Sequence, residues 1–243
     1  MNKYFTIKKS ILTFVVAIFM SFSAIAQTDF VDTGTDCQLA SDSLSLVALY
    51  NSTDGANWTY TWDLSQPVST WYGIILSEDG CNVACIDLDS SVDCRYVITH
   101  GNNLVGTIPK ELGNLTKLNV LSLFSNSLVG EIPIELGNLI NLNILYLGRN
   151  SLVGEIPIEL GNLTNLNILA LGSNNLVGEI PIELGNLTDL NILDLDNNSL
   201  VGEIPKELGN LMYRPPINRT KLVKKFVIFF DYICTARVLK VTH

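Results

Sequence analysis

Asp194 and Asp196 are the two residues whose type and spacing come closest to those of a reactive site. Side chains two positions apart on an extended strand point to the same face, so the two carboxylates would lie next to each other. Such a pair could supply the acid and base of a glycoside hydrolase, or could bind calcium. Against both, an open strand face has no cleft to shift a carboxyl pKa, and the sequence has no Asp-rich loop like that of an EF-hand.

Histidine-based and motif-based catalysis have equally little support. The chain contains two histidines, His100 and His243, and the second is its C-terminal residue. No GxSxG, HExxH or phosphate-binding loop occurs. We therefore predict that the protein is not an enzyme and uses no cofactor.

Four cysteines cluster in the first part of the chain, and a fifth, Cys234, lies far from them. In an exported protein such a cluster indicates disulfides, and four cysteines allow three pairings, which stay open here. A zinc site is the alternative, but no histidine lies at a suitable spacing. The candidate disulfide cysteines are Cys37, Cys81, Cys85 and Cys94.

Asp194 and Asp196 belong to a 24-residue phrase, GEIPIELGNLxxLNILxLxxNxLV, which is repeated through the middle of the chain. Its copies begin at Gly106, Gly130, Gly154 and Gly178, and a shortened copy begins at Gly202. A repeat of this length indicates a solenoid, because one unit cannot bury its own apolar face and stacked units share a core.

The pattern within one copy predicts how each coil turns. Leu145, Tyr146 and Leu147 alternate, so they predict a short strand with both leucines buried and the tyrosine facing outward. Asn150 follows at a bend, where its amide can satisfy backbone groups that no sheet ladder reaches, and we expect stacked copies of the asparagine to bond one another. Pro133 lies on the return side, where it disfavours a helix interior.

The phrase LxxLxLxxNxLxGxIPxxLGxL resembles the leucine-rich repeat of plant receptor ectodomains and of secreted bacterial repeat proteins. Leu142, Leu145, Leu147, Asn150, Leu152, Gly154, Ile156, Pro157, Leu160, Gly161 and Leu163 carry the likeness, which covers residues 94–211. The resemblance implies a leucine-rich repeat solenoid of the α/β class. Such a fold has short parallel strands on a concave face, irregular or 3-10 turns on a convex face, and a helical N-terminal cap. The family has no single activity, so function needs a separate argument.

The N-terminus has the pattern of an export signal. Three lysines precede an apolar run that ends in Ala24-Ile25-Ala26, a small-residue cleavage site. The run is shorter than the ~20 residues of a membrane span. We expect residues 1–26 to be a signal peptide. We also expect the mature chain to be secreted or surface-exposed and to contain no transmembrane span.

Residues 27–93 resemble the N-terminal cap of such repeat proteins. We expect Asp42 to cap a helix over Ser43–Tyr50. Leu46, Leu49 and the three tryptophans would cover the open end of the first coil, which disfavours a carbohydrate-stacking role for the tryptophans. Residues 83–88 have the pattern of an early, irregular strand.

The last segment, residues 212–243, is unlike the repeats. It contains seven bases and one acid, whereas Gln27 to Leu211 contains 23 acids and five bases, a net charge of −18. Such a change of sign indicates a separate tail. Three interpretations of this tail stay open: a makeshift C-terminal cap, a membrane-surface patch, or aberrant coding sequence.

The copies that begin at Gly130, Gly154 and Gly178 share 18 of 24 positions, and three of the six variable positions surround the concave strand. An unchanging frame with variable concave residues is typical of a binding surface, although drift after duplication would also vary exposed positions. The predicted partner-binding residues are His100, Ser122, Phe124, Tyr146, Arg149, Ala170, Ser173, Asp194 and Asp196.

Columns of glutamate are predicted on the convex back, and this acidic surface argues against nucleic acid. We therefore expect a secreted recognition module whose concave face binds a protein or a surface glycan. The alternatives are a structural or adhesion spacer, or a fragment of a larger receptor-like ectodomain. The oligomeric state stays open.

Overall fold

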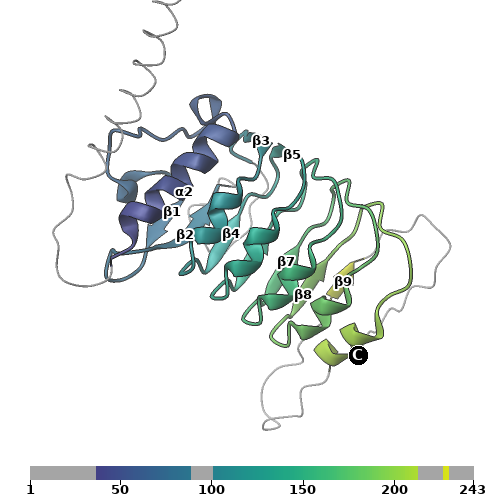
Figure 1. The fold of residues 1–243 in the computed structure, drawn as a ribbon. Helices are drawn as coiled ribbons and strands as arrows, with labels where there is room; N and C mark the ends of the chain where they lie inside the picture. Colours follow the sequence, from purple (N-terminus) through teal and green to yellow (C-terminus); the bar gives the residue numbers. More distant parts are fainter. Residues whose placement is uncertain (1–36, 89–100, 213–226, 230–243) are drawn as a thin grey trace, which may run out of the picture.

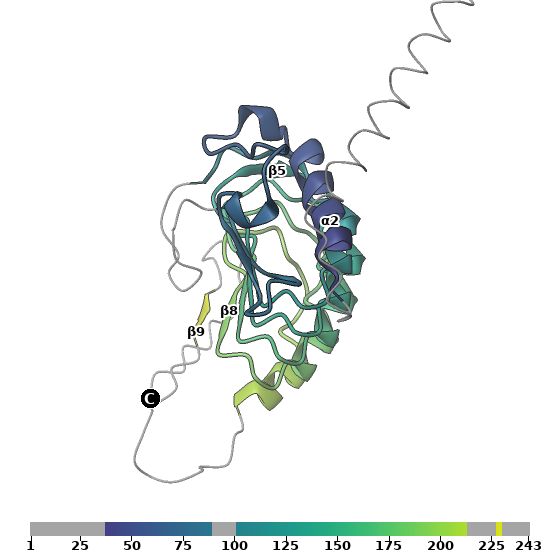
Figure 2. The ribbon, with the colours of Figure 1, turned by 90° about the vertical axis from the view of Figure 1, so that its left-hand side faces the viewer.

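The computed structural model describes residues 37–88, 101–212 and 227–229. The predicted signal peptide, His100, His243, Cys94, Cys234 and most of the tail lie outside these residues. Within the described part, a stack of coils runs from an N-terminal cap to the C-terminal end (Figure 1). One side of the stack carries a sheet and the other carries short 3-10 helices (Figure 2).

The cap contains one α-helix and an antiparallel strand pair. Its elements are α2 (Leu39–Ser52), η1 (Gly55–Asn57), η2 (Val68–Thr70), β1 (Ile74–Leu76) and β2 (Val83–Asp87). The strand predicted at residues 83–88 is therefore confirmed. Because β2 also pairs in parallel with the first repeat strand, it joins the cap to the repeats.

The repeats contribute one strand and one 3-10 helix per coil. The strands are β4 (Val120–Ser122), β6 (Ile144–Tyr146), β7 (Ile168–Ala170) and β8 (Ile192–Asp194). The helices are η3 (Lys110–Asn114), η4 (Ile134–Asn138), η5 (Ile158–Asn162), η6 (Ile182–Asn186) and η7 (Lys206–Met212). A second sheet of two strands, β3 (Val105–Thr107) and β5 (Ser127–Val129), lies elsewhere on the coils.

The main sheet has the order β1-β2-β4-β6-β7-β8-β9, in which β9 is Val227–Phe229, and all pairs after β1–β2 are parallel. Leu145 stands in register with Leu121 and Leu169 of the neighbouring coils, and all three are fully buried. Leu147 is buried as well, whereas Tyr146 is partly exposed. The predicted alternation is confirmed, and it produces one leucine core along the whole array.

Each proline of the IP dipeptide comes directly before a 3-10 helix, as Pro133 does before η4. A proline there loses no helical hydrogen bond, because the first N–H groups of a helix have no partner within it. Within the described residues, no helix combines the length and the apolar composition of a membrane span.

The repeated asparagine connects adjacent coils through their backbones. The Asn150 side-chain oxygen accepts a hydrogen bond from the Leu128 N–H at 3.0 Å. The Asn150 amide donates to the carbonyls of Leu123 and Leu147, both at 3.0 Å. At the first coil, Asn102 exchanges the corresponding two bonds with the backbone of Tyr60 in the cap. The prediction that the asparagine satisfies backbone groups is confirmed, and these groups belong to two coils at once. The prediction that stacked asparagines bond one another is wrong within the described residues, because each amide bonds backbone groups instead.

The three tryptophans form the core of the cap, as predicted. Trp58, Trp62 and Trp71 are buried, and adjacent rings lie 4.9 Å apart between centroids. Because all three rings are buried, they present no platform for a carbohydrate. Leu46 and Leu49 of α2 lie in the same cluster.

The prediction that Asp42 caps a helix is wrong. Helix α2 begins at Leu39, so Asp42 lies within its first turn. The Asp42 side chain is buried and accepts a hydrogen bond from the Val83 N–H at 2.8 Å. A buried carboxylate gains more from this long-range donor than from a solvated helix end, and it thereby ties α2 to β2.

A disulfide joins Cys37, just before α2, to Cys81, just before β2. Cys85 on β2 is disulfide-bonded too, and its partner lies outside the described residues. Because Cys81 and Cys85 are both oxidised, neither can supply a thiolate to zinc, so the alternative of a zinc site at these two cysteines is excluded.

The 3-10 helices approach one another closely at a glycine. A Cβ atom on Gly161 would lie 2.6 Å from both the Cβ and the carbonyl oxygen of Glu183 in the next coil. At the same position of the last helix, a Cβ atom on Gly209 would meet nothing within 4 Å. The glycine is therefore required by the next coil and not by the helix itself.

We predict that Gly161→Ala lowers the free energy of unfolding by about 1–3 kcal/mol, because backbone must move to admit the methyl group. Gly209→Ala is the matched control, and it should be neutral or stabilising by up to ~1 kcal/mol, because alanine restricts the unfolded chain. Urea denaturation followed by circular dichroism measures both. Equal losses in the two variants would show that coil-to-coil packing does not select this glycine.

Candidate functional site

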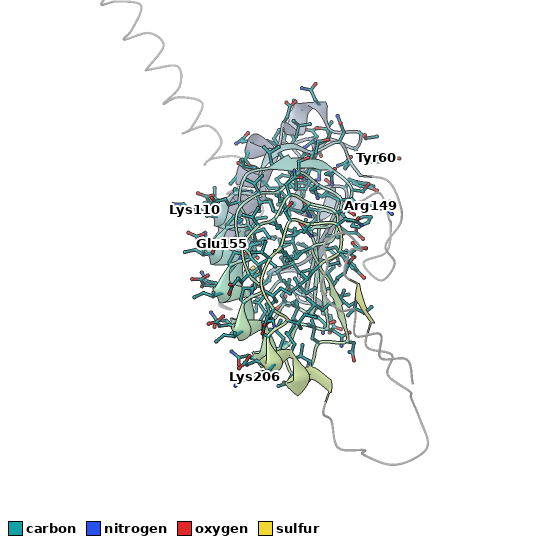
Figure 3. The ribbon with its side chains drawn as sticks, turned by 90° about the vertical axis from the view of Figure 1, so that its right-hand side faces the viewer. Tyr60, Lys110, Arg149, Glu155 and Lys206 are labelled. Carbon is teal, nitrogen blue, oxygen red and sulfur yellow. A yellow bond between two sulfur atoms is a disulfide. The ribbon has the colours of Figure 1, made fainter. Side chains whose placement is uncertain are left out.

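The candidate surface is the sheet face, defined here as the outward-facing side of β4, β6, β7 and β8 with the two or three residues that follow each strand. Arg149 projects from this side, whereas Lys110, Glu155 and Lys206 lie on the opposite, helical side (Figure 3). The sheet face corresponds to the concave face of the sequence analysis. Parallel pairing brings equivalent residues of successive coils next to one another, at the ~4.8 Å spacing of paired strands.

The predicted residues differ in how accessible they are. Ser122 and Ala170 stand in register with Tyr146 on neighbouring strands but are buried, with 2% and 6% of their surface exposed. Phe124, Tyr146, Ser173, Asp194 and Asp196 are partly exposed, and Arg149 is exposed. His100 lies outside the described residues. The sheet therefore brings together eight of the nine predicted residues, of which six are open to a partner.

Phe124 and Arg149 form one end of this surface. The guanidinium carbon of Arg149 lies 5.5 Å from the centroid of the Phe124 ring, which is a cation–π arrangement between adjacent coils. Arg149 has a φ of +54°, a conformation that disfavours most side chains. The equivalent residues Ser125, Ser173 and Asn197 share this conformation, so the coil geometry imposes it and residue type does not.

Two glycines form the middle of the surface. A Cβ atom on Gly148 would lie 3.2 Å from the Phe124 ring and 2.9 Å from the Gly172 carbonyl oxygen. A Cβ atom on Gly172 would collide with the carboxylates of Asp194 and Asp196. The glycines are themselves buried, and they leave room for the larger side chains of the neighbouring coils, Phe124 at the aromatic–cationic end and the two aspartates at the acidic end.

Asp194 and Asp196 form the acidic end. The Asp196 N–H donates a hydrogen bond to Asp194 Oδ1 at 3.2 Å. Partial burial, with a smaller contribution from the Asp196 charge, raises the pKa of Asp194 from 3.8 to about 6, although the Asp196 N–H bond opposes the shift. The expectation that an open strand face leaves carboxyl pKa values unshifted is therefore wrong. The side chain loses enough hydration between neighbouring strands to favour its neutral form.

Sequence reasoning missed a second row on the same face. Ile144, Ile168 and Ile192 precede the central leucine of each strand, stand in register with one another, and are partly exposed. Because i and i+2 residues share a strand face, the alternation that placed Tyr146 outward also placed Ile144 there. Comparison of the copies did not reveal this row, because all three copies carry isoleucine.

On the helical side, the glutamates have a packing role. The Cγ atom of Glu155 lies 2.8 Å from the position that a Cβ atom on Gly178 would take, so its aliphatic stem covers the next coil's glycine. Glu131 covers Gly154 in the same way. The side chains nevertheless remain exposed overall. Packing therefore explains why these exposed glutamates do not vary between copies.

The described residues contain no group of three or more His, Cys, Asp or Glu side chains placed to hold a metal ion. Asp194 and Asp196 alone would provide two carboxylates, fewer than the six to eight oxygen ligands that calcium takes.

Comparison with family models identifies leucine-rich repeats at residues 117–139, 141–163, 165–187 and 189–211. The search of curated protein sequences gave no significant match. The matched segments coincide with the coils whose strands and 3-10 helices are described above.

Solved structures of plant receptor ectodomains share the fold. The ectodomain of the receptor kinase GASSHO1/SCHENGEN3 from Arabidopsis thaliana, in complex with CASPARIAN STRIP INTEGRITY FACTOR 2, is 35% identical over 70% of this chain and 20% of its own, with a TM-score of 0.62. The BIR2 ectodomain from Arabidopsis thaliana is 31% identical over 68% of this chain and 84% of its own, with a TM-score of 0.59.

A third structure contains the Arabidopsis receptor kinase HAESA with the peptide hormone IDA and the co-receptor SERK1. It is 29% identical over 70% of this chain and 32% of its own, with a TM-score of 0.50. The chain thus spans a fifth to a third of the long receptor ectodomains but most of the BIR2 ectodomain. The repeat motif, the coil geometry and the likeness to nearly the whole BIR2 ectodomain together show that this chain belongs to the leucine-rich repeat family.

Proposed function

We propose that the protein is an extracellular recognition module that binds an extended segment of a partner protein along the sheet face, without catalysis. The observation that carries the proposal is the sheet face itself. It holds the partly exposed Phe124 with the exposed Arg149 at one end and a carboxylate pair at the other. Aromatic residues and arginine are the types most enriched at binding hot spots.

The contrast between invariant and variable positions supports this choice of face. Packing accounts for the repeated Gly161, Glu155 and Asn150, because each contacts the backbone or a glycine of a neighbouring coil. The positions of Tyr146, Gly148 and Arg149 vary between copies, and the fold accepts each substitution at the equivalent place. Variation on this face is thus compatible with the coil, so residues here can differ to suit a partner without disturbing the fold.

The charge arrangement suggests which segment would fit. Arg149 belongs to the coil of β6 and Asp194 to that of β8, two strand spacings or about 10 Å away. An extended peptide covers that distance in about three residues. A partner segment that crosses the strands would therefore carry an acidic residue near Arg149 and a basic residue about three positions away, near the two aspartates.

The comparisons support recognition as the role. HAESA is bound to a peptide hormone and GASSHO1/SCHENGEN3 to CASPARIAN STRIP INTEGRITY FACTOR 2 in their structures. The likeness to receptor ectodomains, together with the Cys37–Cys81 disulfide, supports an oxidising, extracellular location. The predicted export signal at residues 1–26 is consistent with this location.

We predict that Tyr146→Ala with Arg149→Ser weakens partner binding at least tenfold. Both substitutions copy the residues of the next coil, Ala170 and Ser173, so the free energy of unfolding should change by less than about 1 kcal/mol, the scale of an exposed cation–π pair. Partners would be isolated from extracellular material of the producing organism with the purified protein. Isothermal titration calorimetry would then compare wild type and variant.

Two further variants control for face and fold in that titration. Glu155→Lys changes the helical side and should bind like wild type, because Glu155 lies opposite Arg149 (Figure 3). Leu145→Ala should lower the free energy of unfolding by about 2–5 kcal/mol through a core cavity. If the double variant binds normally while Glu155→Lys does not, the helical side is the binding surface and the proposal fails.

Asp194 gives a prediction about pH. With a pKa of about 6 in the folded protein and 3.8 ordinarily, the folded state holds a proton that the unfolded chain has released. Stability should therefore fall as pH rises from about 4 through 6. Asp194→Asn should raise the free energy of unfolding, measured by urea denaturation, by on the order of 1 kcal/mol at pH 7.5 and leave it unchanged at pH 3.5. An unchanged pH profile in the variant would contradict this assignment.

A further inference from the structure

The last strand of the sheet comes from the tail and not from a repeat. Val227–Phe229 pairs in parallel with β8, with Val227 opposite Ile192, Ile228 opposite Leu193 and Phe229 opposite Asp194. Figures 1 and 2 show β9 beside β8 at the C-terminal end of the stack. Equivalent strand residues of the repeats are 24 positions apart, whereas Ile192 and Val227 are 35 apart. The segment therefore occupies the next strand position without being a repeat.

The burial of the last coil differs between its two sides. On the sheet side, Leu193 and Leu195 are 0% and 2% exposed, which matches the interior coils. On the return side, Ile204 is 45% exposed, whereas the equivalent Ile156 is 2% exposed. The last coil is thus covered on the side where β9 lies and open at Ile204 on the return side.

Hydrogen bonds between the preceding coils indicate which groups of β8 face this strand. The Leu171 N–H donates to the Asp194 carbonyl at 2.8 Å, and the Ile192 N–H donates to the Asn167 carbonyl at 3.2 Å. The register of β8 with β9 then predicts that the Leu195 N–H faces the Phe229 carbonyl and that the Val227 N–H faces the Asn191 carbonyl. The Ile228 N–H then points away from β8, because N–H directions alternate along a strand.

We propose that the outer edge of β8 is a strand-binding site whose ligand is an extended apolar segment in parallel register, and that Val227–Phe229 of the chain occupies it as a detachable closing strand. An unpaired strand edge is a template for another chain, so its occupation prevents copies from pairing end to end. The segment is tethered through residues 213–226, which holds it at an effective concentration on the order of millimolar. A free peptide of the same sequence therefore competes poorly until the tethered strand is weakened.

The test uses two matched variants of the full chain. Val227→Pro removes the N–H that faces β8, whereas Ile228→Pro removes the N–H that points away, so only the first breaks the pairing. Amide hydrogen exchange is measured at Leu193 and Leu195, and Leu171 serves as the internal control for an intact fold. We expect Val227→Pro to lower protection at Leu193 and Leu195 at least tenfold, with Ile228→Pro within about threefold of wild type.

A second measurement tests the site as a receptor for a ligand. A fluorescent peptide of residues 224–232 should bind the Val227→Pro protein at least tenfold more tightly than wild type, because the edge is then open. The same peptide with Val227→Pro should not bind. The proposal is overturned if Leu195 is unprotected in wild type, if both proline variants have the same effect, or if the peptide binds wild type and variant alike. The wild-type measurement at Leu195 decides the question even if Val227→Pro fails to fold.

Discussion

Contact between the backbones of successive coils is the constraint from which the other features of this protein follow. In each 3-10 helix from η3 to η6 a glycine faces the main chain of the next coil, and a Cβ atom on Gly161 would lie only 2.6 Å from Glu183. At this distance the backbone groups of one coil need partners from the next, and Asn150 supplies them with its side-chain amide. Buried polar groups left without such partners would cost more than the leucine core alone could offset.

This constraint divides the side chains into two classes. Leucines, glycines, asparagines and the stems of the glutamates are held by neighbouring coils, so their identity is repeated. Side chains after each strand, such as Phe124 and Arg149, touch the next coil only at its surface and can differ from copy to copy. The left-handed backbone at Arg149 recurs with serine or asparagine, which indicates that the coil fixes the path of the chain and leaves the side chain open to change.

A solenoid also needs an end, and the two ends of this one are closed by different means. At the N-terminal end, Tyr60 provides the backbone groups that a preceding coil would have offered to Asn102, and a cluster of three tryptophans covers the leucines. At the C-terminal end, Val227–Phe229 pairs with β8 although the segment has none of the repeat's sequence. Backbone pairing depends on main-chain groups, so a strand need not resemble the repeat to complete the sheet.

The repeat period, the inward leucines, the outward Tyr146, the early strand at residues 83–88 and the tryptophan core could all be predicted from the sequence, because each depends on local spacing that recurs or on one dominant apolar surface. Tertiary structure alone decided which groups meet across coils. It brought Asp42 to Val83 instead of to a helix end, placed Arg149 over Phe124, and put Asp194 where burial raises its pKa. It also added a strand from the tail. These contacts depend on residues distant in sequence, so neither the repeat period nor any sequence motif predicts them.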